Sequence, residues 1–290
     1  SIVDGEQLVC GYHGCTYDHD GTCAHIPSQD RVPTGMKVQA FPVIEEPPYI
    51  WIWMGSPGAA AISRPPTVPW VGEPGWETFQ TAWDVAANFM MVHEHYLDFS
   101  YAPVLHGADI PASIRSMPAF SEVEVTETTV RYTRVLPPAR PTDWEAEAGD
   151  LERDIDYKRT ETGTFASPAL HLQRWDVETP AGETLTTTRI HAITPIDDTS
   201  THVVMTSARN YALGRPAATE RLRTFLAGVA QRDNAVLEMA ARHSGYQRWR
   251  DGVDFQADLA SLRLRRIVDD LLSQEARPAG RAASSSSTLA

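Results

Sequence analysis

The chain has 290 residues, of which 42% are hydrophobic and 22% charged, a composition that is typical of a globular protein and excludes a disordered or fibrous one. Lys and Arg number 25 against 38 Asp and Glu, so the formal net charge is −13, and we expect neither nucleic acid nor an anionic membrane surface as a partner. No apolar run approaches the roughly 18–20 residues of a membrane span, and no basic and apolar signal opens the sequence. All three cysteines fall within the first 23 residues, which favours a reducing, cytoplasmic setting and a metal site over a disulfide framework.

The order of apolar patterns predicts an α+β protein, without alternating βαβ units and without an internal repeat. We expect short strands over 1–57, then a proline-rich connection over 56–75 and a helix over 84–101. Further strands are expected over 120–213, and a mobile loop, first Pro-rich and then acidic, interrupts them at 137–156. Amphipathic helices are expected over 217–243 and 256–275, and a disordered, serine-rich tail over 276–290. These elements divide the chain into a small β domain at 1–57, a larger α+β domain at 58–275 and the tail.

The first candidate site is the string CGYHG at residues 10–14, in a glycine-bearing turn that follows a predicted strand. A thiolate and an imidazole three residues apart, here Cys10 and His13, can reach one metal centre. Taken alone, such a pair is more often a small buried cysteine beside a surface histidine. Together with GTCAHIP at 21–27, the string resembles the second half of a Rieske iron–sulfur site, in which two Cys hold one iron of a [2Fe–2S] cluster and two His hold the other. The resemblance implies that Cys10 and His13 are cluster ligands.

The other half of a Rieske site is a C-x-H motif, and the resemblance places it upstream of Cys10, where only nine residues stand. We therefore expect the chain to be part of a longer gene product. Cys10 and His13 are then half of a ligand set that one Cys and one His cannot complete alone. Cys15 stands where these proteins usually carry a bulky aromatic residue. Cys23 and His25 are expected to be surface or loop residues and not substitute ligands.

A second candidate site combines the run 88–106 with one carboxylate far along the chain. The run holds a dense set of titratable side chains: His93, Glu94, His95, Asp98 and His106. In the predicted helix at 217–243, Asp233 continues the apolar stripe between Val229 and Val236. A carboxylate on a core-facing stripe is costly unless it is paired or binds a metal. The alternatives for Asp233 are a buried salt bridge to an arginine such as Arg266, and a metal ligand that faces the run 88–106.

These segments resemble the catalytic domain of Rieske non-haem iron oxygenases, with a closer likeness to the oxygenase components of the vanillate O-demethylase and dicamba monooxygenase type. The likeness covers nearly the whole chain, and rests on LDFS at 97–100 followed by His106, the strand 190–195 followed by Thr201-His202, RDNAVLE at 232–238, and Arg265-Arg266. It implies the C-terminal part of a Rieske β domain at 1–57, then a helix-grip catalytic domain at 58–275, in which a curved antiparallel sheet and helices enclose a substrate cavity.

The resemblance implies a mononuclear Fe(II) held by two histidines and one carboxylate, with positions left open for O₂. His106 is then the second histidine, Asp233 the carboxylate, and Asp98 the acidic bridge to the cluster of a neighbouring subunit. The first histidine is expected three residues after Asp98, where Tyr101 stands, so we expect Tyr101 to bind Fe(II) weakly and to need deprotonation. His95 is excluded as a substitute, because eleven residues of continuous helix would separate it from His106 by about 16 Å.

The function that the resemblance implies is that of an oxygenase component. It receives electrons of NAD(P)H from a separate reductase or ferredoxin, and with O₂ demethylates or hydroxylates a small aromatic compound, often a carboxylate. It also implies a homotrimer with Asp98 at the subunit junction. His191 and His202 are candidate polar residues of the cavity wall, and a histidine satisfied within its strand is the alternative for each. The alternative function, which Tyr101 favours, is a degenerate oxygenase-like protein that binds a small molecule without redox chemistry.

Overall fold

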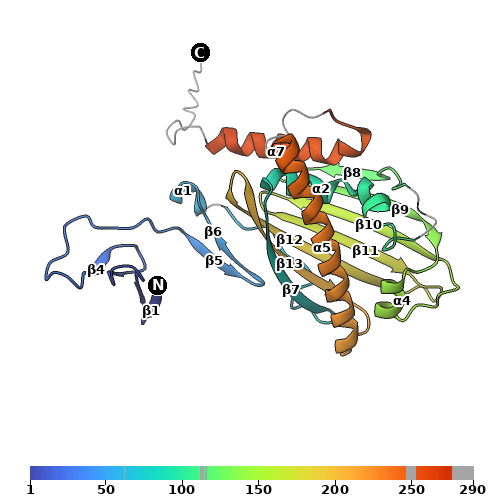
Figure 1. Ribbon diagram of the computed structural model, residues 1–290, viewed down its shortest axis with the longest axis horizontal. Helices are drawn as coiled ribbons and strands as arrows, with labels where there is room; N and C mark the ends of the chain where they lie inside the picture. Colours follow the sequence, from blue (N-terminus) through green and yellow to red (C-terminus); the bar gives the residue numbers. More distant parts are fainter. Residues whose placement is uncertain (62, 112–113, 115, 246–252, 276–290) are drawn as a thin grey trace, which may run out of the picture. The chain divides into compact units, whose positions relative to one another are not determined.

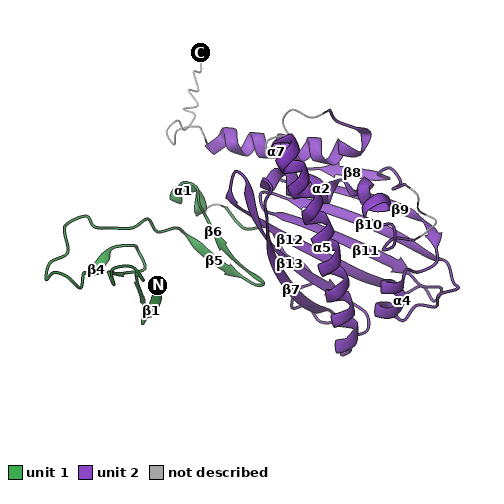
Figure 2. Cartoon of the chain, in the orientation of Figure 1, with its two compact units in different colours: residues 1–65 green, residues 66–290 purple. Residues whose placement is uncertain are grey.

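The structure is a computed structural model, and it describes residues 1–61, 63–111, 114, 116–245 and 253–275. The predicted tail at 276–290 lies outside the described residues. The chain divides into two compact units, Ser1–Pro65 and Pro66–Ala290 (Figure 2). The division falls inside the proline- and glycine-rich stretch 56–75.

The first unit is a small β structure. Four short strands form an antiparallel sheet in chain order: β1 (Ile2–Asp4), β2 (Gln7–Val9), β3 (Thr16–Tyr17) and β4 (Cys23–His25). A hairpin follows, made of β5 (Val43–Glu46) and β6 (Tyr49–Ile52), and then the short helix α1 (Pro57–Ala60). The buried apolar core of this unit is small, and consists of Cys15, Cys23 and Ile26.

The second unit is built on a seven-stranded antiparallel sheet in the order β7-β13-β12-β11-β10-β9-β8. Its strands are β7 (Glu77–Val85), β8 (Glu122–Val125), β9 (Thr129–Ala139), β10 (Tyr157–Ala166), β11 (Leu170–Glu178), β12 (Thr184–Asp197) and β13 (Ser200–Arg209). Buried and less buried residues alternate along β10 and β11, because one face of the sheet packs against helices. The predicted α+β class is confirmed.

Helices cover that face of the sheet. They are α2 (Phe89–Leu97), the 3₁₀ turn η1 (Phe99–Tyr101), α3 (Ala102–Leu105), α4 (Asp143–Gly149), α5 (Pro216–Ser244), η2 (Gln256–Asp258) and α7 (Leu259–Glu275). Figure 1 shows α5 lying across the strands, with α2 and α7 near one of its ends. The predicted helix at 217–243 is confirmed as α5. Among the described helices, none has the length and apolar character that a membrane crossing requires.

The segment from 84 to 106 departs from the predicted continuous helix. β7 runs through Val85, and α2 begins only after Asn88, whose side-chain oxygen accepts a hydrogen bond from the Met90 amide at 2.9 Å. α2 ends at Leu97, because Asp98 takes an extended conformation and its carboxylate accepts a hydrogen bond from the Ser100 amide at 2.9 Å. The chain therefore changes direction between α2 and α3, and the spacing of a continuous helix does not apply.

The predicted loop at 137–156 is also wrong in part. β9 continues to Ala139, and α4 occupies residues 143–149. A capping box starts α4, since the Glu145 side chain accepts a hydrogen bond from the Thr142 amide at 2.8 Å. This Thr-x-x-Glu signal is present in the sequence, and the neighbouring prolines obscured it.

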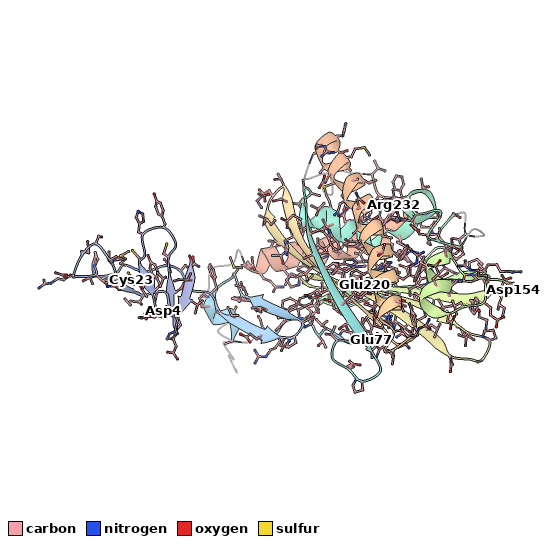
Figure 3. All side chains as sticks on the ribbon, turned by 60° about the horizontal axis from the view of Figure 1, so that its bottom comes forward. Asp4, Cys23, Glu77, Asp154, Glu220 and Arg232 are labelled. Carbon is pink, nitrogen blue, oxygen red and sulfur yellow. The ribbon has the colours of Figure 1, made fainter. Side chains whose placement is uncertain are left out.

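Three arginines are almost completely buried in the sheet, and each is paired with a carboxylate. Arg159 and Glu145 approach to 2.7 Å, Arg134 and Glu161 approach to 2.8 Å, and Arg209 pairs with Glu77, which Figure 3 labels on β7. A buried charge is tolerated when it is paired and hydrogen-bonded in this way. These pairs fix the side-chain layer between the sheet and the helices.

Candidate metal site and substrate cavity

Three side chains from different elements meet at one carboxylate oxygen in the second unit. His106 Nε2, at the end of α3, lies 2.6 Å from Asp233 Oδ1 on α5. His95 Nε2, in the last turn of α2, lies 3.3 Å from the same oxygen. All three side chains are nearly buried, with exposed fractions of 3% for His106, 5% for Asp233 and 8% for His95. Asp233 is therefore buried and faces the run 88–106, whereas its role as a metal ligand stays a prediction.

Asp233 is ionised in this setting. Burial acts to raise its pKa, but the imidazoles of His106 and His95 outweigh burial and hold the pKa well below its usual value. The other ring nitrogen of His106, Nδ1, accepts a hydrogen bond from Arg232 Nε at 3.2 Å and lies 3.9 Å from Asp109 Oδ2 (Arg232 is labelled in Figure 3). Arg232 also pairs with Asp109, so both sides of the His106 ring are held.

The helix on which the exclusion of His95 rested is not continuous. The exclusion assumed one helix from His95 to His106, and the structure breaks that helix at Asp98. The turn through η1 and α3 brings the two histidines back to one carboxylate. His95 Nε2 is buried and makes no hydrogen bond of normal geometry among the described residues, and its polar contact is the 3.3 Å approach to Asp233 Oδ1.

Tyr101 lies beside the same group of side chains, but through its ring. The ring stacks on His95, with centroids 4.1 Å apart and planes 17° apart, and its centroid is 5.9 Å from that of His106. Within the described part of the chain, its hydroxyl makes no hydrogen bond to His106 or Asp233. Burial, and then the negative charge of Asp233, raise the pKa of Tyr101 well above its ordinary value. The phenol is therefore neutral across the pH range of most enzymes.

Asp98 is half-buried and caps η1, as described above. That capping is a local structural role, because it ends α2 and starts the turn that brings His95 back toward His106. The predicted role of Asp98 as a bridge to a neighbouring subunit stays a prediction.

The donor set of His95, His106 and Asp233 has the chemistry of a non-haem iron site, two imidazoles and one carboxylate. In the structure, however, the three side chains close directly on one another. As they stand, the described residues contain no group of three or more His, Cys, Asp or Glu that could hold a metal ion. His106 Nε2 is at hydrogen-bonding distance from Asp233, so a metal would enter by replacing that hydrogen bond, with the single imidazole proton carried on Nδ1, on the side of Asp109.

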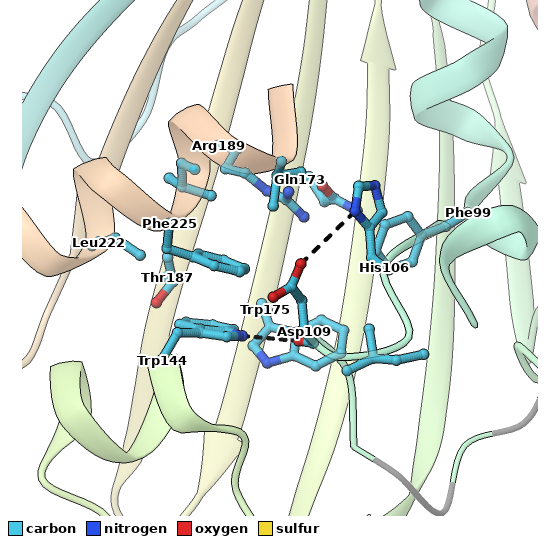
Figure 4. Close-up of a pocket in the computed structure, with 13 residues that line it drawn as sticks. Phe99, His106, Asp109, Trp144, Gln173, Trp175, Thr187, Arg189, Leu222 and Phe225 are labelled. Atoms are coloured by element: carbon cyan, nitrogen blue, oxygen red, sulfur yellow. Dashed lines mark hydrogen bonds and ion pairs between the residues drawn. The ribbon is translucent and has the colours of Figure 1, made fainter. Parts of the chain in front are cut away.

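A cavity opens next to His106, between α5 and strands β11 and β12 (Figure 4). Eight of its lining residues are apolar: Phe99, Ile110, Trp144, Trp175, Leu222, Phe225, Leu226 and Val229. Trp144 is fixed by a hydrogen bond from its Nε1 to the backbone oxygen of Asp109 at 2.9 Å, and its ring stacks on Phe225. Flat aromatic walls of this kind favour a planar, apolar ligand.

The polar lining residues include one cation, Arg189 on β12. Its guanidinium has no hydrogen bond or ion pair within the part of the chain that the structure describes. Gln173 also lines the cavity, and its Nε2 donates to Glu161 at 3.0 Å. Figure 4 shows Arg189 and Gln173 at the same end of the cavity as His106. A guanidinium without a protein partner can bind an anionic group.

The two histidines expected in the cavity wall have other places. His191 is buried and stacks on Tyr96, with centroids 4.0 Å apart, and it is not among the cavity residues. His202 is exposed and its Nδ1 lies 2.6 Å from Asp84. Sequence reasoning missed Arg189 and Gln173. The available signal for Arg189 was an arginine inside the otherwise uncharged strand run at 184–196.

In the first unit, Cys10 and His13 lie in the turn between β2 and β3. The Cys10 amide donates to the Cys15 oxygen at 2.8 Å, and the Gly14 amide donates to the Cys10 oxygen at 3.0 Å. Gly14 has φ +73°, a conformation that glycine adopts without strain. The backbone amides of Tyr12 and His13 lower the pKa of the Cys10 thiol, so the turn favours the thiolate that a cluster iron requires.

The first unit contains a C-x-H string of its own, Cys23-Ala24-His25, downstream of Cys10. Cys23 is buried in the small core and its thiol donates to the His25 oxygen at 3.5 Å, whereas His25 is exposed. The expected surface position holds for His25 and is wrong for Cys23. All three cysteines of the chain are free.

Two family models match the chain. The Rieske [2Fe-2S] domain matches residues 1–42, and the vanillate O-demethylase oxygenase C-terminal domain matches residues 85–274. The first contains Cys10 and His13, and the second contains His95, His106 and Asp233.

Known proteins resemble the chain over most of its length. The vanillate O-demethylase oxygenase subunit of Pseudomonas sp. is 28% identical, over 95% of this chain and 86% of that protein. A putative toluene-4-sulfonate monooxygenase system iron-sulfur subunit of Comamonas testosteroni is 26% identical, over 94% of this chain and 82% of that protein. The crystal structure of dicamba monooxygenase bound to 3,6-dichlorosalicylic acid superposes with a TM-score of 0.84 at 24% identity, over 95% of this chain and 83% of that one, which shows a shared fold.

Proposed function

The chain belongs to the vanillate O-demethylase oxygenase family, and from that premise we propose that it is the oxygenase component of a multicomponent system that demethylates or hydroxylates a small aromatic acid with O₂. Its cofactors are the [2Fe–2S] cluster and the non-haem iron of this family. One observation supports the substrate class: the guanidinium of Arg189, which has no partner in the described part of the chain, lies in an aromatic cavity beside His106.

Arg189 and the aromatic walls of the cavity bind different parts of the substrate. Trp144, Trp175 and Phe225 offer flat apolar surfaces to a ring, and Arg189 offers paired N–H donors to a carboxylate or sulfonate. Two similar proteins point the same way, since one is named for toluene-4-sulfonate and the other was crystallised with 3,6-dichlorosalicylic acid, and both compounds are aromatic anions. An anion held at Arg189 places the remainder of the ring system along the wall that contains His106 (Figure 4).

Residues of the two units have separate roles in this proposal. Cys10 and His13 hold the cluster, and His106 and Asp233 hold the non-haem iron. When bound, the cluster supplies electrons and the iron activates O₂. With iron on Nε2, the His106 Nδ1–H would face Asp109, with which Arg232 pairs, and the apolar walls exclude water from the ring of the substrate.

The partners are part of the same proposal. A separate reductase or ferredoxin supplies electrons from NAD(P)H, and the assembly is a homotrimer in which Asp98 bridges two subunits. The half-buried position of Asp98 at a helix end supports a place near the surface of the unit. Sedimentation of the holoenzyme as a monomer would contradict the trimer and, with it, the role of Asp98.

Turnover tests the proposal. The oxygenase is incubated with a reductase, NADH and O₂, together with a panel of methoxybenzoates, methylbenzoates and toluenesulfonate, and each acid is matched by its neutral amide. We expect an oxidised product, found by mass spectrometry, from at least one acid and none from its amide. Binding of the acids without any O₂-dependent product would overturn the oxygenase and favour the redox-inactive binding protein. Equal turnover of acid and amide would overturn the role of Arg189.

A further inference from the structure

We propose that His95, in place of Tyr101, completes the mononuclear iron site with His106 and Asp233. This inference rests on the proposed function, because it names the third protein ligand of the iron that the function requires. It assigns to Tyr101 the role of a positioning residue that holds the His95 ring. The family pattern expects the third ligand at position 101, and this chain carries a tyrosine there.

The first argument is the distance between donor atoms. His95 Nε2 and His106 Nε2 lie 3.3 Å and 2.6 Å from Asp233 Oδ1. A metal with ligands at about 2.1 Å and right angles between them requires adjacent donors about 3 Å apart. Both separations fall near that value, on either side of it. A metal site requires the Asp233 carboxylate to move away from His106, from 2.6 Å toward that separation.

The second argument is the state of the His95 ring. Its side chain is 8% exposed, and its Nε2 is buried without a hydrogen-bond partner among the described residues. A buried polar atom without a partner costs stability, so its position calls for an explanation. This nitrogen points at a carboxylate that His106 already contacts, and a bound cation gives it the missing partner.

The third argument is the backbone. Asp98 stops α2 immediately after the turn that carries His95, and the chain then folds through η1 into α3. The break converts two histidines that are eleven residues apart into neighbours at Asp233. Residue 95 can therefore act as a ligand only because the chain bends at Asp98, and the spacing of the histidines in the sequence does not show this.

The fourth argument concerns Tyr101. Its ring stacks face to face on His95, and it also packs against a cluster of buried apolar side chains that includes Phe99. Within the described residues, the hydroxyl makes no hydrogen bond to Asp233 or His106. A ring in this position restricts the rotation of the His95 imidazole and keeps Nε2 directed at Asp233.

The experiment uses the full chain and Co(II) as a spectroscopic probe for the iron. Anaerobic titration gives the affinity, and the proton NMR spectrum of the Co(II) form shows a shifted N–H signal for each coordinated imidazole. We expect two such signals in the unsubstituted chain. We expect one signal, and an affinity lower by at least about 100-fold, in His95→Ala. Tyr101→Phe keeps the ring that stacks on His95, so we expect two signals and an affinity within about threefold, as nothing in its coordination set has changed.

His243→Ala is the matched control, because His243 is an exposed histidine on α5 whose Nδ1 lies 2.8 Å from the Met239 oxygen of the same helix. It is expected to keep both signals. Circular dichroism verifies that each variant is folded, and His95→Gln replaces His95→Ala if the latter is not.

Two results would overturn the inference: full affinity and two signals in His95→Ala or His95→Gln, or loss of binding in Tyr101→Phe. Metal binding is measured without substrate, so it separates this inference from the proposed function. A chain that binds Co(II) through His95 and oxidises no aromatic acid keeps the inference and refutes the function. A chain that still oxidises an aromatic acid after His95 is removed keeps the proposed function and refutes the inference.

Discussion

Replacement of Arg189 by methionine separates substrate binding from folding, because this guanidinium has no hydrogen-bond or ion-pair partner among the described residues. Arg189→Met keeps the length and apolar stem of the side chain and removes the charge. A hydrogen-bonded ion pair to a carboxylate contributes about 1.5–3 kcal/mol, so the dissociation constant for an aromatic acid should rise by about 10-fold to 150-fold. The unfolding free energy should fall by less than about 1 kcal/mol, since no internal ion pair is broken and an unpaired charge is removed from an apolar cavity.

Isothermal titration calorimetry with benzoate and benzamide measures the first quantity, and urea unfolding measures the second. Affinity for benzamide should be unchanged in Arg189→Met. Arg189→Lys keeps the charge but loses the paired N–H donors, so its affinity for benzoate should lie between those of the unsubstituted chain and Arg189→Met. An unchanged affinity for benzoate in Arg189→Met would refute the reasoning, as would a loss of more than about 2 kcal/mol in unfolding free energy, which would show that Arg189 is a structural residue.

Three further predictions concern the scaffold. Gly163→Ala should destabilise by about 2–4 kcal/mol in urea unfolding, because its Cβ would lie 2.3 Å from the buried Tyr132 ring, and a loss below about 1 kcal/mol would count against this packing. Glu145→Gln should cost about 3–5 kcal/mol, because it leaves the buried Arg159 charge uncompensated, and a neutral result would show that water reaches that pair. Burial lowers the pKa of His191 to about 3, so below about pH 6.5 the unfolded chain takes up a proton that the folded chain does not. The free energy of unfolding should therefore be about 2 kcal/mol lower at pH 5 than above pH 6.5 on account of this residue. His191→Phe should reduce this acid loss, measured by urea unfolding at both pH values, and an identical pH profile in the variant would contradict the assignment.

The sequence allowed the prediction of those features that depend on local pattern. The apolar stripe of α5 runs through Val229, Asp233 and Leu237, and all three are buried as the helical period requires. The strands of the large sheet followed from alternation, and the Cys10–His13 turn from a short motif. Each of these features is set by residues that are neighbours on one element.

The features that sequence reasoning missed depend on how elements meet. His95 joins the site only because the chain bends after Leu97, and helical periodicity carries no information about where a helix will stop at an Asp cap. Arg189 faces a cavity that forms between β12 and α5, so its role appears only when the two are packed together. α4 was missed because the prolines that precede it favour a loop, although Thr142 and Glu145 carry a helix start signal.

The central claim is that a mononuclear iron sits between His95, His106 and Asp233, at the edge of a cavity that holds an aromatic acid through Arg189. An anomalous difference map at the iron edge, from crystals of the holoenzyme grown with Fe(II) and benzoate, tests it most directly. The account predicts an iron peak at bonding distance from both imidazoles and the carboxylate, with the benzoate carboxylate on Arg189. An iron bonded to the Tyr101 hydroxyl with His95 turned away, or no iron peak beside Asp233, would contradict it.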